Sequence, residues 1–326
     1  MIPAALRDAI ADEIALLRDF APGVKTSAED LLWRDADLGP PGVLSPNRQC
    51  RLVEAADGWL AVNLARAEDR ALLPAWLGAA PDETGWDAVD RLVRRRGVRE
   101  LVDDAAFLGL PVAMVGEALP SVPAIASDCP AGGASPRPTV LDLSALWAGP
   151  LCAGLLADAG LAVTRVESVT RPDPTPQSGP ELDRRINGGK RRMALRLDDP
   201  QLIDLIDGAR IIVTSGRPHA LARLGLTPER VFARNPGLTW IAITAHGFHG
   251  EAAMRVGFGD DCAAAGGLVG WHGGRPRFIG DALADPLTGL RAARLALEYL
   301  AAGQCGLIDV ALAATAADFA ARSGLR

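Results

Sequence analysis

The chain has 326 residues, of which 49% are apolar and 23% are charged, as in an ordinary globular protein with a sizeable core. Its formal net charge of −6 argues against a broad nucleic-acid-binding surface, so an anionic ligand would have to meet a local group of arginines. The five cysteines are scattered without metal-ligand spacing, which argues against a disulfide framework and against a metal site.

The N-terminal third is predicted to form a small α+β unit. Residues 2–20 have the pattern of an amphipathic helix, and their acidic side chains distinguish them from a secretion signal. Residues 51–55 and 59–63 are predicted to form a hairpin around a turn at 56–58. Three helices are predicted to follow, at 70–77, 86–95 and 98–107. The apolar run at 111–115 fits an edge strand. No segment of the chain reaches the apolar length of a membrane span, so we expect a cytoplasmic protein without a membrane partner.

A stretch rich in Gly, Pro and small residues at 129–138 is predicted to be a linker. We therefore expect a small domain at 1–130, a linker at 131–138 and a large domain at 139–326. Strand and helix patterns alternate in the large domain, which indicates a largely parallel sheet covered by helices. Its strands are expected at 140–143, 161–166, 193–197, 211–214, 239–244 and 306–311. Its helices are expected at 150–159, 199–209, 228–235 and 286–301.

Such a sheet suggests a nucleotide-binding fold, but the usual phosphate-binding motifs do not occur. The loop after the first strand, 144–150, does not match the GxGxxG pattern of dinucleotide-binding domains. The glycine-rich segment 266–270 lies far along the chain and is predicted to be a turn. A nicotinamide enzyme and a nucleoside-triphosphate enzyme are therefore disfavoured.

Asp285 stands directly before Pro286 and a long helix rich in Ala and Leu. Asp at the N-cap with Pro at the first helical position is a favoured helix start, so a capping role is the first interpretation. The N-terminus of a helix also favours an ionised carboxylate, which suits a nucleophile. Asp285 can therefore serve both purposes.

Several segments of the large domain occur together in the order and spacing of one protein family. They lie at 140–144, 148–150, 155–160, 187–197, 217–226, 235–236 and 284–300. Over roughly residues 138–318 the sequence resembles the class III CoA-transferases, a superfamily that includes formyl-CoA transferase, the carnitine-CoA transferases and the 2-methylacyl-CoA racemases. The resemblance implies an α/β fold with a Rossmann-like CoA-binding domain, which a smaller α+β domain precedes in this chain. It also implies an acyl-CoA and a carboxylic acid as substrates, and a homodimer.

The first part of the chain resembles the small domain of the same family. Residues 51–63 are similar to the start of that domain, and residues 109–113 to the segment that follows its helices. In ordinary members the small domain comes after the large one. The order found here therefore predicts a circularly permuted member, or the middle of an ancestral tandem. Chain ends that lie close together make such a rearrangement tolerable.

The resemblance also assigns roles to individual residues. Asp285 is expected to attack the acyl-CoA thioester and to carry CoA as an aspartyl-CoA thioester, with the Gly266-Gly267 turn as a candidate oxyanion site. Nine residues are expected to bind CoA: Trp147, Ala148, Lys190, Arg191, Leu195, Arg196, Ser215, Arg217 and Arg223. For any single arginine of this set a solvated surface charge is the competing interpretation, and Trp147 could equally be a core aromatic residue.

Two other functions stay open. Racemases of the superfamily pair the aspartate with a histidine, but Phe258 occupies the corresponding position here, so a two-base proton transfer lacks its second base. His246 and His249 are expected to be loop residues rather than substitutes for that base. The alternatives to CoA transfer are therefore a racemase or acyl-CoA lyase, and a non-catalytic subunit that binds CoA thioesters.

Overall fold

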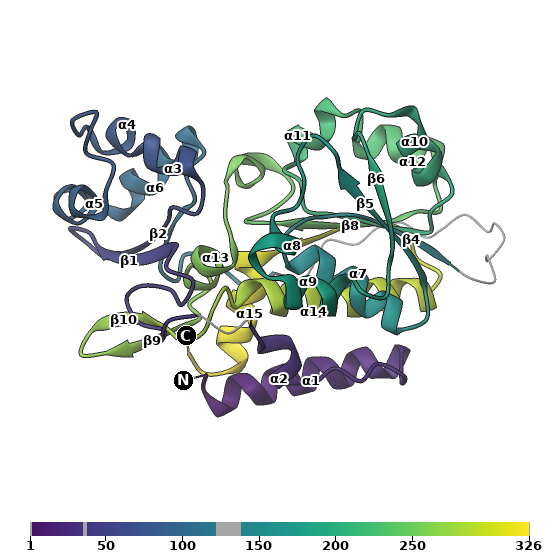
Figure 1. Cartoon of the computed structure of the whole chain (residues 1–326). Helices are drawn as coiled ribbons and strands as arrows, with labels where there is room; N and C mark the ends of the chain where they lie inside the picture. The colour runs from purple at the N-terminus through teal and green to yellow at the C-terminus, as the bar shows by residue number, and fades with distance from the viewer. Residues whose placement is uncertain (1, 35–37, 122–137, 326) are drawn as a thin grey trace.

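The structure is a computed structural model that describes residues 2–34, 38–121 and 138–325. Except for Pro138, the predicted linker at 131–138 lies outside the described residues. The described chain forms a large half around a parallel sheet and a small half around an antiparallel sheet (Figure 1). Within these ranges, none of the helices has both the length and the apolar character needed to span a bilayer.

The large half is built on a six-stranded sheet in which neighbouring strands run parallel. Across the sheet the strands are β6 (Arg191–Leu195), β5 (Ala162–Ser168), β4 (Thr139–Leu143), β7 (Ile211–Thr214), β8 (Thr239–Thr244) and β11 (Gly306–Ala311). Numbered by their succession in the chain, they follow the Rossmann order 3-2-1-4-5-6. The predicted Rossmann-like α/β fold is therefore confirmed. In sheets of this order, ligands bind at the carboxyl ends of the strands, where the order reverses between β4 and β7.

The central strands β7 and β8 are apolar except for threonines at their ends, as expected where both faces of a strand are covered. β7 and β8 are buried at every position, as expected for strands of a doubly covered parallel sheet. Successive side chains of a strand point to opposite faces, so Ile211 and Val213 enter one hydrophobic core and Ile212 enters the other.

Helices cover both faces of this sheet (Figure 1). One face packs against α7 (Ala148–Asp158), α14 (Ala284–Ala301) and α15 (Leu312–Arg322). The opposite face packs against α10 (Pro200–Asp207), α11 (Pro218–Arg223) and α12 (Pro228–Arg234). The short helices α8 (Thr175–Ser178) and α9 (Pro180–Asn187) lead from β5 to β6, and the 3-10 turn η1 (Gly250–Met254) follows β8.

The N-terminal helix α1 (Ala4–Phe20) packs against α14 and α15, along the lower side of the molecule in Figure 1. Its buried Glu13 forms ion pairs with Arg291 and Arg294 of α14 and with Arg322 of α15. The next helix, α2 (Ala28–Leu32), contributes to the same core. Both helices thus share the core of the large half, although the predicted domain boundaries group them with the small domain.

We expect Glu13→Gln to destabilise this docking by about 2 kcal/mol, because it leaves the three arginines without their shared buried carboxylate. Burial acts to raise the pKa of Glu13, but Arg291 and Arg294 outweigh it and lower the pKa to about 2. The stabilisation is therefore present above pH 4.5 and lost as the pH falls through 2. Urea unfolding at pH 7 and at pH 3 measures both effects. The exposed Glu29→Gln serves as the control, and an equal loss of stability in both variants would contradict the prediction.

The small half is a three-stranded antiparallel sheet covered by helices. Its elements are β1 (Cys50–Glu54), β2 (Trp59–Asn63), α3 (Ala67–Ala71), α4 (Leu73–Leu77), α5 (Trp86–Val93), α6 (Val98–Leu108) and β3 (Val112–Met114). The predicted hairpin is confirmed, and β3 lies at an edge as expected. The helix predicted at 70–77 is instead split into α3 and α4. Pro74 lies in the first turn of α4, where its missing N–H is tolerated, and it cannot continue α3.

The two halves meet at α13 (Gly259–Ala265), which follows β8 and packs on β2 and β3. Backbone N–H groups of Gly116 and Ala118 donate to the carbonyl oxygens of Ala264 and Ala265, both at 2.9 Å. A hairpin of β9 (Val269–His272) and β10 (Arg275–Phe278) extends the junction. Because α13 follows the carboxyl end of β8, the small half lies on the side of the large sheet where ligands bind in this fold.

Candidate active site

Asp285 lies in the first turn of α14, but it is not the N-cap. The helix begins at Ala284, its N-cap is Leu283, and the backbone N–H of Asp285 already donates to the Ala282 carbonyl at 2.9 Å. The capping role predicted for Asp285 is therefore wrong by two positions. Pro286 is accommodated because the first turn of a helix needs no N–H donor there. A carboxylate in this first turn is still stabilised by the helix dipole.

Two glycines let the backbone pack closely around Asp285 and α14. A Cβ atom on Gly259, the first residue of α13, would overlap with Oδ2 of Asp285, so only glycine lets the carboxylate lie against this backbone. One helical turn after Asp285, a Cβ on Gly289 would come within 2.7 Å of the Ala148 carbonyl oxygen. Gly289 thus allows α14 to pack closely on the start of α7. The lack of a side chain at Gly259 thus creates space at the carboxylate.

The carboxylate of Asp285 lies among three others, those of Asp260, Asp261 and Asp281. Burial raises the pKa of Asp285 to about 8; Arg34 opposes this rise, and the three carboxylates add to it. Burial likewise raises the pKa of Asp260 to about 6, with a further contribution from Asp281, and that of Asp261 to about 7. A carboxylate that is poorly solvated and ionises near neutral pH is the kind of nucleophile that acyl transfer requires.

Two asparagines from the N-terminal part of the chain hold the neighbouring carboxylates. Asn47 donates through Nδ2 to Oδ2 of Asp260 at 2.7 Å and to Oδ1 of Asp281 at 2.8 Å. Asn63, at the end of β2, donates to Oδ1 of Asp261 at 2.8 Å. Neither asparagine was identified from the sequence, because each lies about 200 residues from its partner and in no recognisable motif.

Arg34 was also not identified from the sequence. Its Nε donates to Oδ2 of Asp281 at 2.7 Å, and its guanidinium lies on the ring of Trp147. Trp147, one of the expected CoA-binding residues, is only 6% exposed. Arg34 therefore lies between Trp147 and the acidic side chains. Ala148, which follows Trp147, is also buried.

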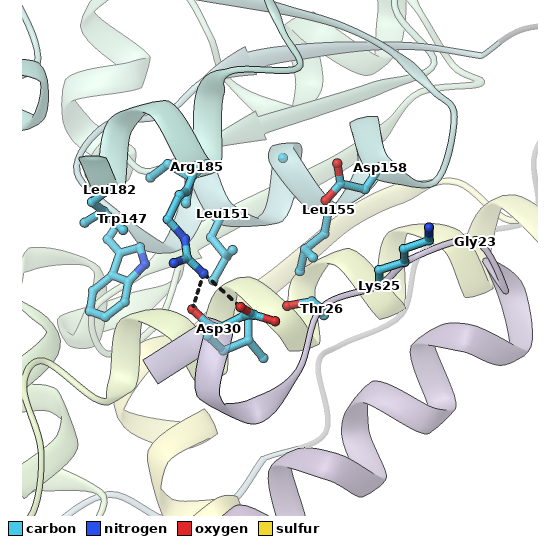
Figure 2. A pocket seen from close by; sticks show the side chains of 13 residues that line it. Gly23, Lys25, Thr26, Asp30, Trp147, Leu151, Leu155, Asp158, Leu182 and Arg185 are labelled. Carbon is cyan, nitrogen blue, oxygen red and sulfur yellow. Dashed lines mark hydrogen bonds and ion pairs between the residues drawn. The ribbon is translucent and has the colours of Figure 1, made fainter. Parts of the chain in front are cut away.

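Trp147 also lines a cavity of about 410 Å³ between the N-terminal segment 23–31 and helices α7 and α9 (Figure 2). Apolar side chains of α7, including Leu151 and Leu155, form one side. Arg185 of α9 reaches across to Asp30 and donates to its carboxylate and its backbone carbonyl (Figure 2). Trp147 thus stands between this cavity and the group around Asp285.

Ser215 and Arg217, two further expected residues, follow β7 at the point where the strand order reverses. The Ser215 hydroxyl accepts from the N–H of Ala145, which follows β4, at 2.9 Å. Burial lowers the pKa of Arg217, and the nearby charges of Arg66, Arg171 and Arg223 lower it further. These arginines therefore form one positively charged group.

The positively charged group spans both halves of the molecule. Arg66 belongs to the small half and donates to the Gly109 carbonyl at 3.0 Å. Gly109 in turn approaches the guanidinium of Arg217. Arginines gathered at this edge of a Rossmann-type sheet suit the phosphates of a nucleotide-like ligand.

The remaining expected residues do not join this group. Lys190 is buried, and its ammonium donates to Oδ2 of Asp142, the Pro150 carbonyl and Oδ1 of Asn187 at 2.6–2.8 Å. Because an ammonium has three donors, Lys190 has none left for a ligand. Arg191, Leu195 and Arg196 belong to β6 or follow it, and β6 is separated from β7 by β4 and β5. Leu195 is buried, Arg191 is exposed, and Arg196 pairs with Asp198 at 2.7 Å.

The turn at Gly266 and Gly267 does form, but it cannot act as the expected oxyanion site. It lies at the opposite end of α13 from Gly259 and Asp285. Its two N–H groups donate to the carbonyl oxygens of Cys262 and Ala264. A Cβ on Gly266 would come within 2.5 Å of Ala316, so this turn instead allows α13 to pack on α15.

One group of side chains near Asp285 could hold a metal ion. A ring nitrogen of His246, the Cys262 thiol and a carboxylate oxygen of Asp261 lie within 4.8 Å of one another. Asp261 already accepts from Asn63 and from the N–H of Phe258, and Cys262 donates to the Ala245 carbonyl. Burial lowers the pKa of His246 to about 3, with a further contribution from Arg255, so His246 is neutral and a weak base. Asp261 and Cys262 thus have hydrogen-bond partners within the protein, whereas Nε2 of His246 is buried without one among the described residues.

Comparison with known proteins identifies relatives of the large half. A family model described as CoA-transferase family III matches residues 138–325. The succinyl-CoA–D-citramalate CoA-transferase of Chloroflexus aurantiacus is 31% identical over 203 residues, which cover 54% of this chain and 50% of that protein. An acyl-CoA transferase of Fusarium pseudograminearum is 31% identical over 173 residues, which cover 46% of this chain and 38% of that protein.

Solved structures give the same relationship. The crystal structure of a hypothetical protein from Mycobacterium tuberculosis superposes with a TM-score of 0.53 at 28% identity, covering 60% of this chain and 59% of that one. A CAIB/BAIF family protein from Brucella suis superposes with a TM-score of 0.50 at 26% identity. The chain spans half or less of the length of the two curated relatives described above.

Proposed function

This chain belongs to CoA-transferase family III, and we propose that it moves CoA from an acyl-CoA thioester to a carboxylic acid with Asp285 as the nucleophile. The Asp285 carboxylate attacks the thioester carbonyl and expels the CoA thiolate, which leaves a mixed anhydride. The thiolate then attacks the aspartyl carbonyl, which releases the first acid and leaves an aspartyl-CoA thioester. The acceptor carboxylate reverses both steps and regenerates Asp285.

The observation that carries this proposal is the placement of Asp285. It lies in the first turn of α14 against the backbone of Gly259, and burial raises its pKa to about 8. Burial keeps water away from the carboxylate. The ionised carboxylate is then poorly hydrated, which makes it more reactive toward a thioester. The helix N-terminus offsets part of the cost of its ionisation.

The direct test is to trap the aspartyl intermediate. The protein is incubated with a panel of acyl-CoAs, quenched with hydroxylamine, digested and mapped by mass spectrometry. Succinyl-CoA belongs in the panel because relatives are named for succinyl-CoA transfer. A hydroxamate at Asp285 is the expected result. Labelling at another carboxylate, or none with any acyl-CoA that exchanges its acyl group, would refute the proposed nucleophile.

We propose that Arg217 and Arg223 bind CoA phosphates, because they lie in the positively charged group at the switch between β4 and β7. Arg217→Ala and Arg223→Ala are each expected to raise the dissociation constant for CoA about tenfold. Isothermal titration calorimetry measures this, and Arg275→Ala on the β10 hairpin is the control. Affinities that stay unchanged in both variants would remove these arginines from the site. The buried, internally paired Lys190 gives no support to a direct role in binding CoA.

A non-catalytic CoA-binding subunit is the second candidate. CoA binding without labelling of Asp285 would favour this candidate. Racemase chemistry is less well supported, since Phe258 replaces the second base and the nearby His246 has a pKa of about 3.

We further propose that the chain is a circularly permuted member that forms a homodimer. In support of permutation, the small half precedes the large one, and the first and last described helices, α1 and α15, pack against each other. Joining the ends at this contact and opening the chain between the halves would restore the usual order.

The proposed homodimer is tested separately. Light scattering in solution measures the oligomeric state, and a monomer at micromolar concentration would exclude the dimer.

A further inference from the structure

Arg34 connects the N-terminal segment with the site around Asp285. It follows α2, and its side chain is 13% exposed. Nε donates to Oδ2 of Asp281 at 2.7 Å, Nη2 donates to the Asp281 carbonyl at 3.0 Å, and Nη1 donates to the Trp33 carbonyl at 2.7 Å. One face of the guanidinium also lies on the Trp147 ring. The guanidinium is thus held by hydrogen bonds along its edges and by the aromatic ring on one face.

The charges that face Asp285 come from three parts of the chain. Asp260 and Asp261 belong to α13, Asp281 precedes α14, and Arg34 comes from the N-terminal segment. The three carboxylates oppose ionisation of Asp285, whereas Arg34 favours it. Arg34 interacts electrostatically with Asp281, Asp285 and Asp260, so its single positive charge balances several carboxylates.

We propose that Arg34 is a positioning residue that sets the charge state of Asp285, so that the N-terminal segment completes the reactive site. This inference rests on the proposed role of Asp285 as nucleophile. The segment lies outside residues 138–325, which the family model matches. Arg34 is thus a contribution of this chain that the family match does not include.

The contacts of Arg34 explain why its charge is effective. Asp281 orients the guanidinium, and the ring of Trp147 covers the face that water would otherwise solvate. A charge held in a poorly hydrated site acts on its neighbours more strongly than the same charge in water. Asn47 shares Asp281 with Arg34 through a bond of 2.8 Å, which fixes the position of that carboxylate.

The test is a direct titration of Asp285, so that it does not depend on catalysis. The protein is labelled with ¹³C at the aspartate carboxyl carbons, and the Asp285 signal is assigned by its loss in Asp285→Asn. We expect a midpoint near pH 8 in the unaltered protein. In Arg34→Met, whose side chain can still pack on Trp147, the midpoint should rise by at least one pH unit, a tenfold increase in proton affinity.

Two further variants separate charge from packing. Arg34→Lys keeps the positive charge and should restore most of the original midpoint, and Arg7→Gln, which removes an exposed pair on α1, should leave it unchanged. Arg34→Gln replaces Arg34→Met if the latter fails to fold. An unchanged midpoint in a folded, uncharged variant overturns the proposal, as does an equal rise in Arg34→Lys. A shifted midpoint in a protein that never forms a hydroxamate at Asp285 would sustain the electrostatic role of Arg34 and refute Asp285 as the nucleophile.

Discussion

Asp285→Asn is expected to abolish the trapped aspartyl intermediate and to lower the rate of CoA transfer by about 10⁴-fold or more. An amide has nearly the shape of the carboxylate but cannot form the mixed anhydride or the aspartyl-CoA thioester. Packing against Gly259 and in the first turn of α14 should be preserved. Initial rates of CoA exchange measure the loss, and mass spectrometry of the quenched enzyme shows whether the intermediate still forms.

The matched control is Asp198→Asn, which alters an exposed carboxylate paired with Arg196. Transfer by this variant should equal that of the unaltered protein. If Asp285→Asn retains more than about a hundredth of the original rate, Asp285 is not the nucleophile. Calorimetry of CoA binding to Asp285→Asn then distinguishes a catalytic defect from a binding defect, since the proposed CoA-phosphate contacts lie at Arg217 and Arg223.

The same substitution carries a second, opposite effect on stability. The pKa of Asp285 is about 8 in the folded protein and near 3.8 when unfolded, so the folded state binds more protons between these values. Stability conferred by this site therefore falls as the pH rises from about 4 to about 8. Asp285→Asn removes the buried charge, so its melting temperature should exceed that of the unaltered protein at pH 8 and match it near pH 4.

Much of the parallel sheet could be predicted because its strands are short apolar runs separated by helices. β7 and β8 are apolar except for threonines at their ends and are buried throughout, so their position in a doubly covered sheet follows from the sequence. Helix α13, by contrast, was not predicted from the sequence. It is buried at every position, and a helix buried all round has no amphipathic pattern to reveal it. The β9–β10 hairpin was missed despite a usable signal, the Gly273-Gly274 pair at its turn.

The candidate site was predictable only where its residues stand in motifs. Asp285, Arg217 and Arg223 could be predicted because each lies in a segment whose order and spacing resemble the family. Arg34, Asn47 and Asn63 could not, because their contacts span about 200 residues or more of the chain and depend on how the two halves dock. Lys190 shows the converse limit, since its position in a family motif did not reveal that its ammonium is used inside the protein.

The candidate site is therefore assembled from segments that lie far apart in the chain. The large half supplies the proposed nucleophile and most of the positively charged group, whereas residues 34–63 supply the cation and the amides that organise the acidic neighbours. A family match over 138–325 alone would predict a site without these contacts.

The largest expected effect on stability comes from Asp142, at the carboxyl end of β4. Its carboxylate is fully buried and pairs with Lys190 at 2.8 Å and with Arg165 at 3.2 Å, both of which are also buried. Asp142→Ala leaves these two cations without their common partner, and we expect a loss of about 3–5 kcal/mol of unfolding free energy. Urea unfolding followed by circular dichroism measures the loss.

The pairing also predicts how the effect depends on pH. Burial acts to raise the pKa of Asp142, but Lys190 and Arg165 outweigh it and hold the pKa below its usual value. The stabilisation is therefore fully present above the unfolded pKa near 3.8 and disappears as the pH falls through the lower folded pKa.

The double variant Asp142→Asn/Lys190→Met removes one charge of each sign, and Arg165 keeps Asp173 at 2.6 Å as a partner. It should recover a substantial part of the stability that Asp142→Ala loses. A loss below about 1 kcal/mol in Asp142→Ala would mean that water reaches the two cations and that β4 does not end in a buried ion-pair network.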